Sequence, residues 1–213
     1  MKLYTLFRSS AAYRVRIALN LKGLSYESVG VALAKGEHRT AEYAAINPQQ
    51  LIPALVADGT VLNQSLAIIE YLDEIYPDRP LLPPDPLGRA RVRSMALAIA
   101  CDIHPLNNLR VLNYLRTRLR QHEAGVNAWY RHWIAEGFAG LEKQVREYSI
   151  GQRYCYGDDV SLADICLVPQ IYNARRFECD LGPYPTLVAI STHLESLAPF
   201  AAARPEAQPD APA

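Results

Sequence analysis

The chain has no surplus of charge of either sign. Lys plus Arg and Asp plus Glu number 22 each, which gives a formal net charge of zero at neutral pH. Neither half of the chain carries the excess of Lys and Arg that a nucleic-acid-binding surface needs. No apolar run approaches the roughly 18 residues of a membrane-spanning helix, and the N-terminus does not resemble a signal peptide. We therefore expect a cytoplasmic protein with no nucleic-acid partner and no membrane partner.

Cysteine is also scarce. The chain has four cysteines, Cys101, Cys155, Cys166 and Cys179, and no two of them form a C-x-x-C pair. This spacing excludes a dithiol redox motif and a zinc knuckle of paired cysteines. We expect four reduced, buried thiols and no metal site.

Strand and helix signals alternate over residues 1–77. Asp58 and Gly59 mark a tight hairpin turn, and Gly23 stands where the first helix should end. The predicted strands are Lys2 to Leu6, Tyr26 to Leu33, Ala54 to Val56 and Val61 to Leu62, and the predicted helices are Ala11 to Lys22, His38 to Ile46 and a third that starts at Ser65. The order βαβαββα predicts a thioredoxin-like domain with a mixed sheet of four strands.

A proline-rich segment follows this domain. Residues 78–88 are predicted to form a semi-rigid linker, because the prolines between Pro77 and Pro86 cannot continue a helix. Residues 89–213 are predicted to form an all-helical domain, with helices over 89–101, 107–118, 127–148, 162–175 and 185–197. Pro105 should kink the chain and redirect Asp102, His104 and Asn108. The tail from Pro205 is expected to be loosely ordered.

Two hydroxyls lie between the first strand and the first helix. Ser9 and Ser10 occupy a helix N-terminus, where unpaired N–H groups and a partial positive charge stabilise an anion. A plain N-cap is the competing interpretation, and on this segment alone it is favoured.

Three further blocks change that preference. They are Asn47 to Leu55, Gln64 to Leu72 and Val160 to Pro169. Together with the first segment, and in this order, they resemble the zeta class of glutathione transferases over essentially the whole chain. Members of this class include maleylacetoacetate isomerases and maleylpyruvate isomerases. The chain departs from the class at Ala11, where a cysteine is usual, but both serines remain.

The resemblance implies a set of residues that bind glutathione as a cofactor. Ser9 is the expected hydrogen-bond donor to the glutathione sulfur, with Ser10 as its neighbour, and the helix N-terminus should help to lower the thiol pKa. A cis Ile52–Pro53 bond would turn the Ile52 backbone toward the tripeptide. The other expected cofactor-binding residues are His38, Gln49, Gln50, Gln64, Ser65, Asp102, His104 and Asn108. Asp102 would reach the glutathione of the partner in a homodimer.

Three arginines match substrate positions in the bacterial members of the class. Arg8, Arg110 and Arg176 would bind the carboxylates of a small dicarboxylate, because a guanidinium fork suits a carboxylate or a developing enolate. Arg8 is also assigned a catalytic role beside the two serines. The implied activity is glutathione-dependent cis–trans isomerisation of maleylacetoacetate in aromatic amino-acid degradation. The alternatives are isomerisation of maleylpyruvate in gentisate degradation, a general transferase or dehalogenase acting on small haloacids, and an idle interaction module.

The fourth block has a structural interpretation instead. Ser161 and Asp164 have the spacing of an N-capping box, flanked by Val160 and Ile165 at staple positions. We assign this block to the folding of the helical domain and give it no catalytic role.

Overall fold

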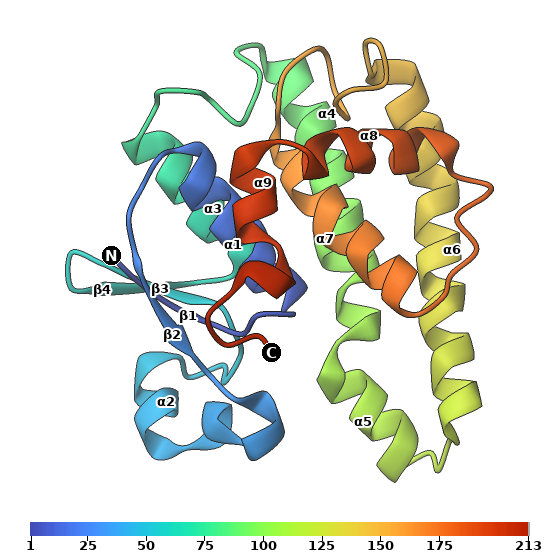
Figure 1. The fold of residues 1–213 in the computed structure, drawn as a ribbon. Helices are drawn as coiled ribbons and strands as arrows, with labels where there is room; N and C mark the ends of the chain where they lie inside the picture. The colour runs from blue at the N-terminus through green and yellow to red at the C-terminus, as the bar shows by residue number, and fades with distance from the viewer. Residues whose placement is uncertain (213) are drawn as a thin grey trace. The chain divides into compact units, whose positions relative to one another are not determined.

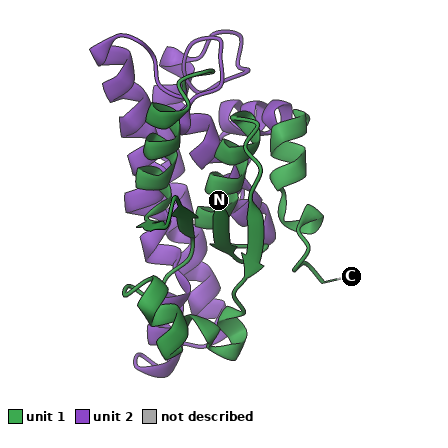
Figure 2. Cartoon of the chain, turned by 90° about the vertical axis from the view of Figure 1, so that its left-hand side faces the viewer, with its two compact units in different colours: residues 1–80, 196–213 green, residues 81–195 purple. Residues whose placement is uncertain are grey.

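The computed structural model describes residues 1–212 and divides into two compact units (Figure 2). The first unit contains Met1–Pro80 together with the chain from Ser196 onward, and the second contains Leu81–Glu195. Among the described residues, no helix has both the length and the apolarity that crossing a membrane requires.

The first unit is built on a four-stranded sheet. Its strands are β1 (Lys2–Thr5), β2 (Glu27–Gly30), β3 (Ala54–Ala57) and β4 (Thr60–Asn63), in the order β2-β1-β3-β4 (Figure 1). Strand β1 pairs parallel with β2 and antiparallel with β3. The hairpin turn has φ of 49° at Asp58 and 76° at Gly59, the positive values that a two-residue type I′ turn needs. The predicted mixed sheet is confirmed.

Helices α1 (Ser10–Leu21) and α3 (Ser65–Ile75) pack on each other in this unit. Both bury apolar stripes at helical spacing, which include Val15 and Leu19 in α1 and Ile68 and Leu72 in α3. The helical segments between β2 and β3 are η1 (Leu33–Lys35), η2 (Glu37–Arg39) and α2 (Ala41–Ile46). The thioredoxin-like order of elements is therefore confirmed. Strand β2 is shorter than predicted, because its pairing with β1 extends only from Glu27 to Gly30.

The second unit is helical, as predicted. Its elements are α4 (Pro86–Leu97), the π-helix η3 (Ala98–Ile103), η4 (Pro105–Asn107), α5 (Leu109–Thr117), α6 (Glu123–Tyr148), α7 (Leu162–Arg176) and α8 (Pro185–Glu195). Helix α4 begins before the predicted start because Asp85 caps it and Pro86 occupies its first turn. The predicted break at Pro105 takes the form of the π-helix followed by the short η4.

The end of the chain differs from the prediction. The sequence pattern places all of residues 89–213 in the helical domain and predicts a loose tail from Pro205. In the structure the chain from Ser196 onward belongs to the first unit, where α9 (Ala198–Ala203) packs on α1. Phe200 and Ala203 are fully buried, and the Asn20 amide donates to the Pro199 carbonyl at 3.0 Å. After η5 (Pro205–Ala207), the Asp210 carboxylate accepts a hydrogen bond from the Phe7 N–H at 2.8 Å. Apolar burial and these hydrogen bonds hold the tail against the sheet unit.

The four cysteines are free, as predicted. Cys155 and Cys166 are buried, and burial raises the pKa of the Cys155 thiol. The expectation of burial is wrong for Cys101, which is exposed on η3, and Cys179 is only partly covered.

The Ser161–Asp164 capping box is present at the start of α7. The Asp164 carboxylate is fully buried and accepts hydrogen bonds from the Ser161 N–H at 2.8 Å, the Ser161 hydroxyl at 2.7 Å and the Cys155 N–H at 2.7 Å. These contacts join the start of α7 to the loop before it. They support the structural role expected for this block.

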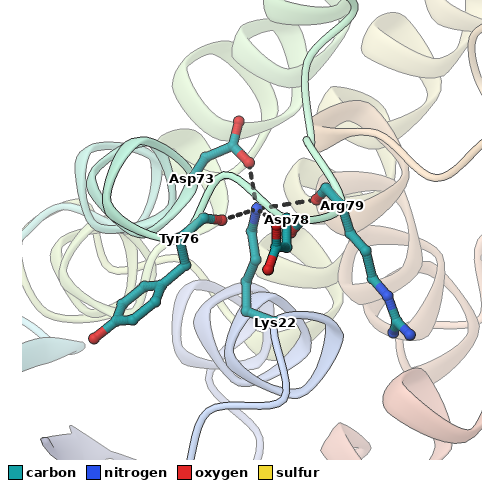
Figure 3. Close-up of polar contacts among 5 residues, drawn as sticks. All are labelled: Lys22, Asp73, Tyr76, Asp78 and Arg79. Atoms are coloured by element: carbon teal, nitrogen blue, oxygen red, sulfur yellow. Dashed lines mark hydrogen bonds and ion pairs between the residues drawn. The ribbon is translucent and has the colours of Figure 1, made fainter.

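The C-terminal ends of α1 and α3 meet at Lys22 (Figure 3). The Lys22 ammonium donates to the Asp73 carboxylate at 2.6 Å and to the backbone carbonyls of Tyr76, Asp78 and Arg79 at 2.7, 3.2 and 2.9 Å. Its side chain has no solvent exposure. One buried cation therefore fixes the chain that leaves α3 and runs toward the second unit.

Candidate functional site

Ser9 is the N-cap of α1. Its hydroxyl oxygen accepts a hydrogen bond from the Ala12 N–H at 3.3 Å, and its own N–H donates to the Leu6 carbonyl at 3.0 Å. Capping uses the hydroxyl as an acceptor, so its hydrogen can still be donated to an anion at the helix N-terminus. Ser10 is the first residue of α1 and is buried. The capping and anion-binding interpretations of Ser9 are therefore compatible.

The N-terminus of α3 brings together two residues predicted to bind the cofactor. Gln64 is the N-cap, with φ of 68°, and its amide donates to the Gln49 side-chain oxygen at 2.8 Å. Ser65 is not the cap that the sequence suggested. It is the first helical residue, it is buried, and its hydroxyl accepts from the Arg14 guanidinium at 3.4 Å. A buried cation thus lies beside a helix N-terminus, an arrangement that favours a carboxylate ligand.

The loop before β3 presents a free stretch of backbone. The Ile52–Pro53 bond is cis, as predicted. The Ile52 N–H and C=O form no hydrogen bond with any residue in the described range 1–212. The preceding carbonyl, that of Leu51, accepts from the Tyr43 hydroxyl at 2.8 Å and the Asn47 amide at 2.7 Å. Tyr43 and Asn47 therefore fix the loop through Leu51. The Ile52 N–H and C=O remain available to pair with an extended ligand.

Replacing Tyr43 with Phe should lower the free energy of unfolding by about 1 kcal/mol, because one buried hydrogen bond to Leu51 is lost. Ionisation of the Tyr43 hydroxyl should also lower the stability of the wild type at alkaline pH. Burial raises the pKa of Tyr43 from 10.0 to about 12, so the folded state retains a proton that the unfolded chain has lost. The Tyr43 contribution should be complete below pH 10 and disappear between pH 10 and about 12. Urea denaturation of both proteins from pH 8 to pH 12 measures it; a difference independent of pH would contradict this assignment.

The other predicted residues of the first unit are Arg8, which is exposed, and Gln50 and His38, which are partly covered. Arg8 is exposed, with its guanidinium carbon 5.5 Å from the centre of the Phe7 ring. Gln50 has a positive φ of 54°. His38 lies in η2 with a buried Nδ1 that has no hydrogen-bond partner among the described residues. Burial, aided by the neighbouring Arg39, lowers the pKa of His38, so the ring is neutral at pH 7.

In the second unit, Tyr130 of α6 contacts both segments that carry the arginines predicted to bind substrate. The Asn107 amide, at the end of η4, donates to the Tyr130 carbonyl at 3.2 Å. The Phe177 ring, which directly follows α7, stacks on the Tyr130 ring with centres 3.5 Å apart. Arg110 follows η4 in α5, and Arg176 is the last residue of α7. Tyr130 is thus a shared support for both.

Arg110 and Arg176 are exposed, and neither forms an ion pair with a residue in the described part of the chain. The Arg176 guanidinium lies 4.9 Å from the Phe177 ring centre. Arg175, its neighbour, is instead paired with Glu195 at 2.6 Å. Both predicted arginines are therefore available to bind an anion.

The three remaining predicted cofactor residues surround the break at Pro105. Asn108 caps α5 by accepting from the Arg110 N–H at 3.1 Å, and His104 ends η3. Asp102 is exposed and lines a shallow hollow of about 460 Å³ with Cys101, Ile103, Leu106, Trp133 and Glu136. Their contact with glutathione stays a prediction.

Two residues near Ser9 were missed by sequence reasoning. Arg16 is fully buried and donates to backbone carbonyls of the loop that precedes Ser9, and Asp210 accepts from the same loop. The one signal for Arg16 is its helical spacing of four from buried Ala12, which places a charge on an apolar stripe. No local pattern distinguishes Asp210 in a tail rich in Pro and Ala.

Comparison with known proteins agrees with this arrangement. The family model described as "Glutathione S-transferase, N-terminal domain" matches residues 8–75. A probable maleylacetoacetate isomerase of Vibrio cholerae is 54% identical over 98% of this chain and 97% of its own. A solved holo structure of a maleylpyruvate isomerase, described as a bacterial zeta-class glutathione S-transferase, is 49% identical, covers 100% of both chains and has a TM-score of 0.97. A maleylacetoacetate isomerase from Methylobacterium extorquens with bound malonate and glutathione is 42% identical, covers 100% of both chains and has a TM-score of 0.96.

The chain has a thioredoxin-like sheet, a capping hydroxyl at the first helix and a cis-proline loop, followed by a helical unit. It shares this architecture with the glutathione S-transferases. The chain belongs to the glutathione S-transferase family, in its zeta class.

Proposed function

We propose that this protein is a glutathione-dependent isomerase that converts maleylacetoacetate to fumarylacetoacetate. The observation that carries the proposal is Ser9, whose hydroxyl caps α1 through its oxygen and retains a hydrogen to donate to an anion at that helix end. The 54% identical relative with the same named activity supports the choice of substrate.

The residues of the first unit fit a bound tripeptide. The Ile52 backbone has a donor and an acceptor that pair with no described residue, and the N-terminus of α3 with Ser65 and Arg14 favours a carboxylate. In this proposal Ile52 pairs with the peptide backbone of glutathione, and Ser65 and Gln64 hold its γ-glutamyl carboxylate. Gln49, Gln50 and His38 line the glycine and cysteinyl end of the tripeptide.

When bound, glutathione supplies a thiolate whose reversible addition to the conjugated double bond permits rotation about that bond. Ser9 donates a hydrogen bond to the sulfur and, with the N-terminus of α1, favours its deprotonated form. Arg8, Arg110 and Arg176 bind the carboxylates of the substrate and stabilise the enolate oxygen that develops as the double bond becomes single. Ser10 supports the helix end behind Ser9.

The arginines supply a test that separates this isomerase from a transferase for neutral electrophiles. Arg110→Ala and Arg176→Ala should each lower kcat/KM on maleylacetoacetate roughly 10- to 150-fold, because one charge-assisted hydrogen bond to an anion is worth about 1.5–3 kcal/mol. Glutathione affinity, measured by calorimetry, should change little. Arg→Lys should restore part of the activity, since the charge returns without the fork.

Arg118→Lys and Arg118→Ala are suitable controls, because Arg118 is an exposed residue at the end of α5. Unchanged kcat/KM in both folded Ala variants of Arg110 and Arg176 would mean that these arginines are ordinary surface charges. Absence of any glutathione-dependent isomerisation by the wild type would overturn the proposed function itself.

Maleylpyruvate is the second candidate substrate, because the solved structure with a TM-score of 0.97 is that of a maleylpyruvate isomerase. The two substrates differ by one methylene. One methylene in a pocket changes the binding free energy by only about 1–3 kcal/mol. Comparing kcat/KM for both compounds with one enzyme preparation decides between them.

We also propose a cytoplasmic homodimer, on the basis of family membership. Asp102, exposed beside the hollow on η3, would then reach the glutathione held by the partner. His104 and Asn108 orient the same segment. Sedimentation of the wild type, with glutathione titration of Asp102→Ala, tests this assembly.

A further inference from the structure

Arg16 of α1 is fully buried, and its guanidinium is surrounded by oxygen acceptors of the first unit. It donates to the Phe7 carbonyl at 2.7 Å, the Leu6 carbonyl at 3.3 Å and the Thr5 hydroxyl at 3.0 Å. These three residues run from the end of β1 into the loop that leads to Ser9. The fourth acceptor is the carbonyl of Ala203, the last residue of α9, at 3.0 Å.

Asp210 also binds this loop, at the N–H of Phe7 rather than at its carbonyl. Its carboxylate accepts from the Phe7 N–H at 2.8 Å, so both the N–H and the C=O of Phe7 are bound by charged groups. Hydrogen bonds to charged groups are shorter and stronger than those between neutral groups. The loop therefore has a support formed by one helix residue and one tail residue.

This support is one hydrogen bond away from Ser9. The Leu6 carbonyl that receives Arg16 also accepts the Ser9 N–H at 3.0 Å. A displacement of Leu6 or Phe7 would therefore move the backbone of Ser9 and with it the hydroxyl. Arg16 and Asp210 form hydrogen bonds with the backbone of Leu6 and Phe7. Arg16 and Asp210 therefore act on Ser9 through the loop.

The titratable groups near this support are Arg16, Asp210 and the phenols of Tyr13 and Tyr26. Burial lowers the pKa of Arg16 to about 10, against the opposing effects of Tyr26, Asp210 and Tyr13. The guanidinium is therefore still charged at neutral pH. Its Cζ lies 5.4 Å from the centre of the Tyr13 ring, which packs against it.

We propose that Arg16 and Asp210 are positioning residues for Ser9: they fix the Leu6–Phe7 backbone, so that the C-terminal tail sets the geometry of the thiolate-stabilising loop. The inference rests on the proposed function, since it assigns the tail a role in activating glutathione. It also makes the order of the tail a determinant of activity, because Asp210 binds the Phe7 N–H in the loop that leads to Ser9.

The test uses Asp210→Ala, its conservative partner Asp210→Asn, and Arg16→Lys in the full-length chain. Asp158→Ala and Arg118→Lys are matched controls, because both residues are exposed and belong to the second unit rather than to the loop or its support. Two readouts follow Ser9 directly: the ultraviolet absorbance of bound glutathione thiolate against pH, and amide hydrogen exchange of residues 6–10 in the protein without glutathione.

Asp210→Ala should raise the pH midpoint of thiolate formation by roughly half a unit to one unit, because the anion loses an aligned donor. Exchange over residues 6–10 should become faster, and kcat should fall roughly threefold to tenfold while the Kd for glutathione changes less. Asp210→Asn keeps an acceptor for the Phe7 N–H and should recover most of the exchange protection. Arg16→Lys should resemble Asp210→Ala; should it fail to fold, the Asp210 variants decide alone.

Midpoint and exchange both unchanged in Asp210→Ala would overturn the inference even if the wild type is an active isomerase. Equal effects in Asp158→Ala would overturn it as well, because the change would then not be specific to the support. Failure of the proposed function can be distinguished from failure of this inference. A wild type that binds glutathione without isomerising maleylacetoacetate, with a raised midpoint in Asp210→Ala, would leave the support in place and overturn the proposed function.

Discussion

Replacing Ser9 with Ala should lower the rate of glutathione-dependent isomerisation by roughly 10²–10³-fold, the range for loss of one preorganised donor to a developing or bound anion. The physical reason is the double use of the hydroxyl. Its oxygen is occupied by the Ala12 N–H, and its hydrogen is the group available to the sulfur. Ser10→Ala should have a much smaller effect, because Ser10 is buried within the first turn of α1.

The acidic limb of the pH–rate profile gives the more specific readout. Without the Ser9 hydroxyl, the pKa of bound thiol should rise, and the limb should move to higher pH in Ser9→Ala but not in Ser10→Ala. Ser9→Ala also removes an N-cap, which should cost about 0.5–2 kcal/mol of stability. Urea denaturation measures that cost separately, and Ser9→Thr retains the hydroxyl as a control. Equal, small rate losses in the two Ala variants would contradict the assignment to Ser9.

Much of the first unit could be predicted because its features are local in the chain. The Asp58-Gly59 turn, the stripe of Val15 and Leu19, and the Ile52–Pro53 pair are each contained in a few residues. The same holds for Ser9, where the junction of a strand and a helix is visible in the sequence. Local patterns do not link these separate blocks to one another. The expectation that they form one site comes from the family resemblance.

The support beneath Ser9 could not be predicted for the opposite reason. Phe7 and Asp210 are 203 positions apart, and neither has a neighbour that indicates the pairing. The apolar residues of α9 form a helix of only 6 residues, too short for a periodic pattern to identify. The cap of α3 was also misassigned, because Gln64 adopts a positive φ that its residue type does not suggest.

Lys22 shows how strongly a contact without any sequence signal can matter for stability. Lys22→Met keeps a chain of similar length but removes the ammonium that donates to the Asp73 carboxylate and to the three backbone carbonyls of residues 76, 78 and 79. Loss of one partner from a buried charge pair typically costs about 3–5 kcal/mol. The positive charge at the C-terminal ends of α1 and α3, which favours both helix dipoles, is lost as well.

We therefore expect Lys22→Met to lower the free energy of unfolding by about 3–5 kcal/mol, a larger loss of stability than Tyr43→Phe or Ser9→Ala should cause. Lys35→Met is the matched control, because Lys35 is exposed in η1 and should change stability by less than about 0.5 kcal/mol. Glutathione affinity of the folded protein should be nearly unchanged, since Ser9 and Ser65 lie at the opposite, N-terminal ends of the two helices. Urea denaturation and glutathione titration of the same preparations measure both quantities. A stability loss no larger than that of Lys35→Met would show that water replaces the ammonium without cost, and a large loss of affinity would show that the two ends of these helices are coupled.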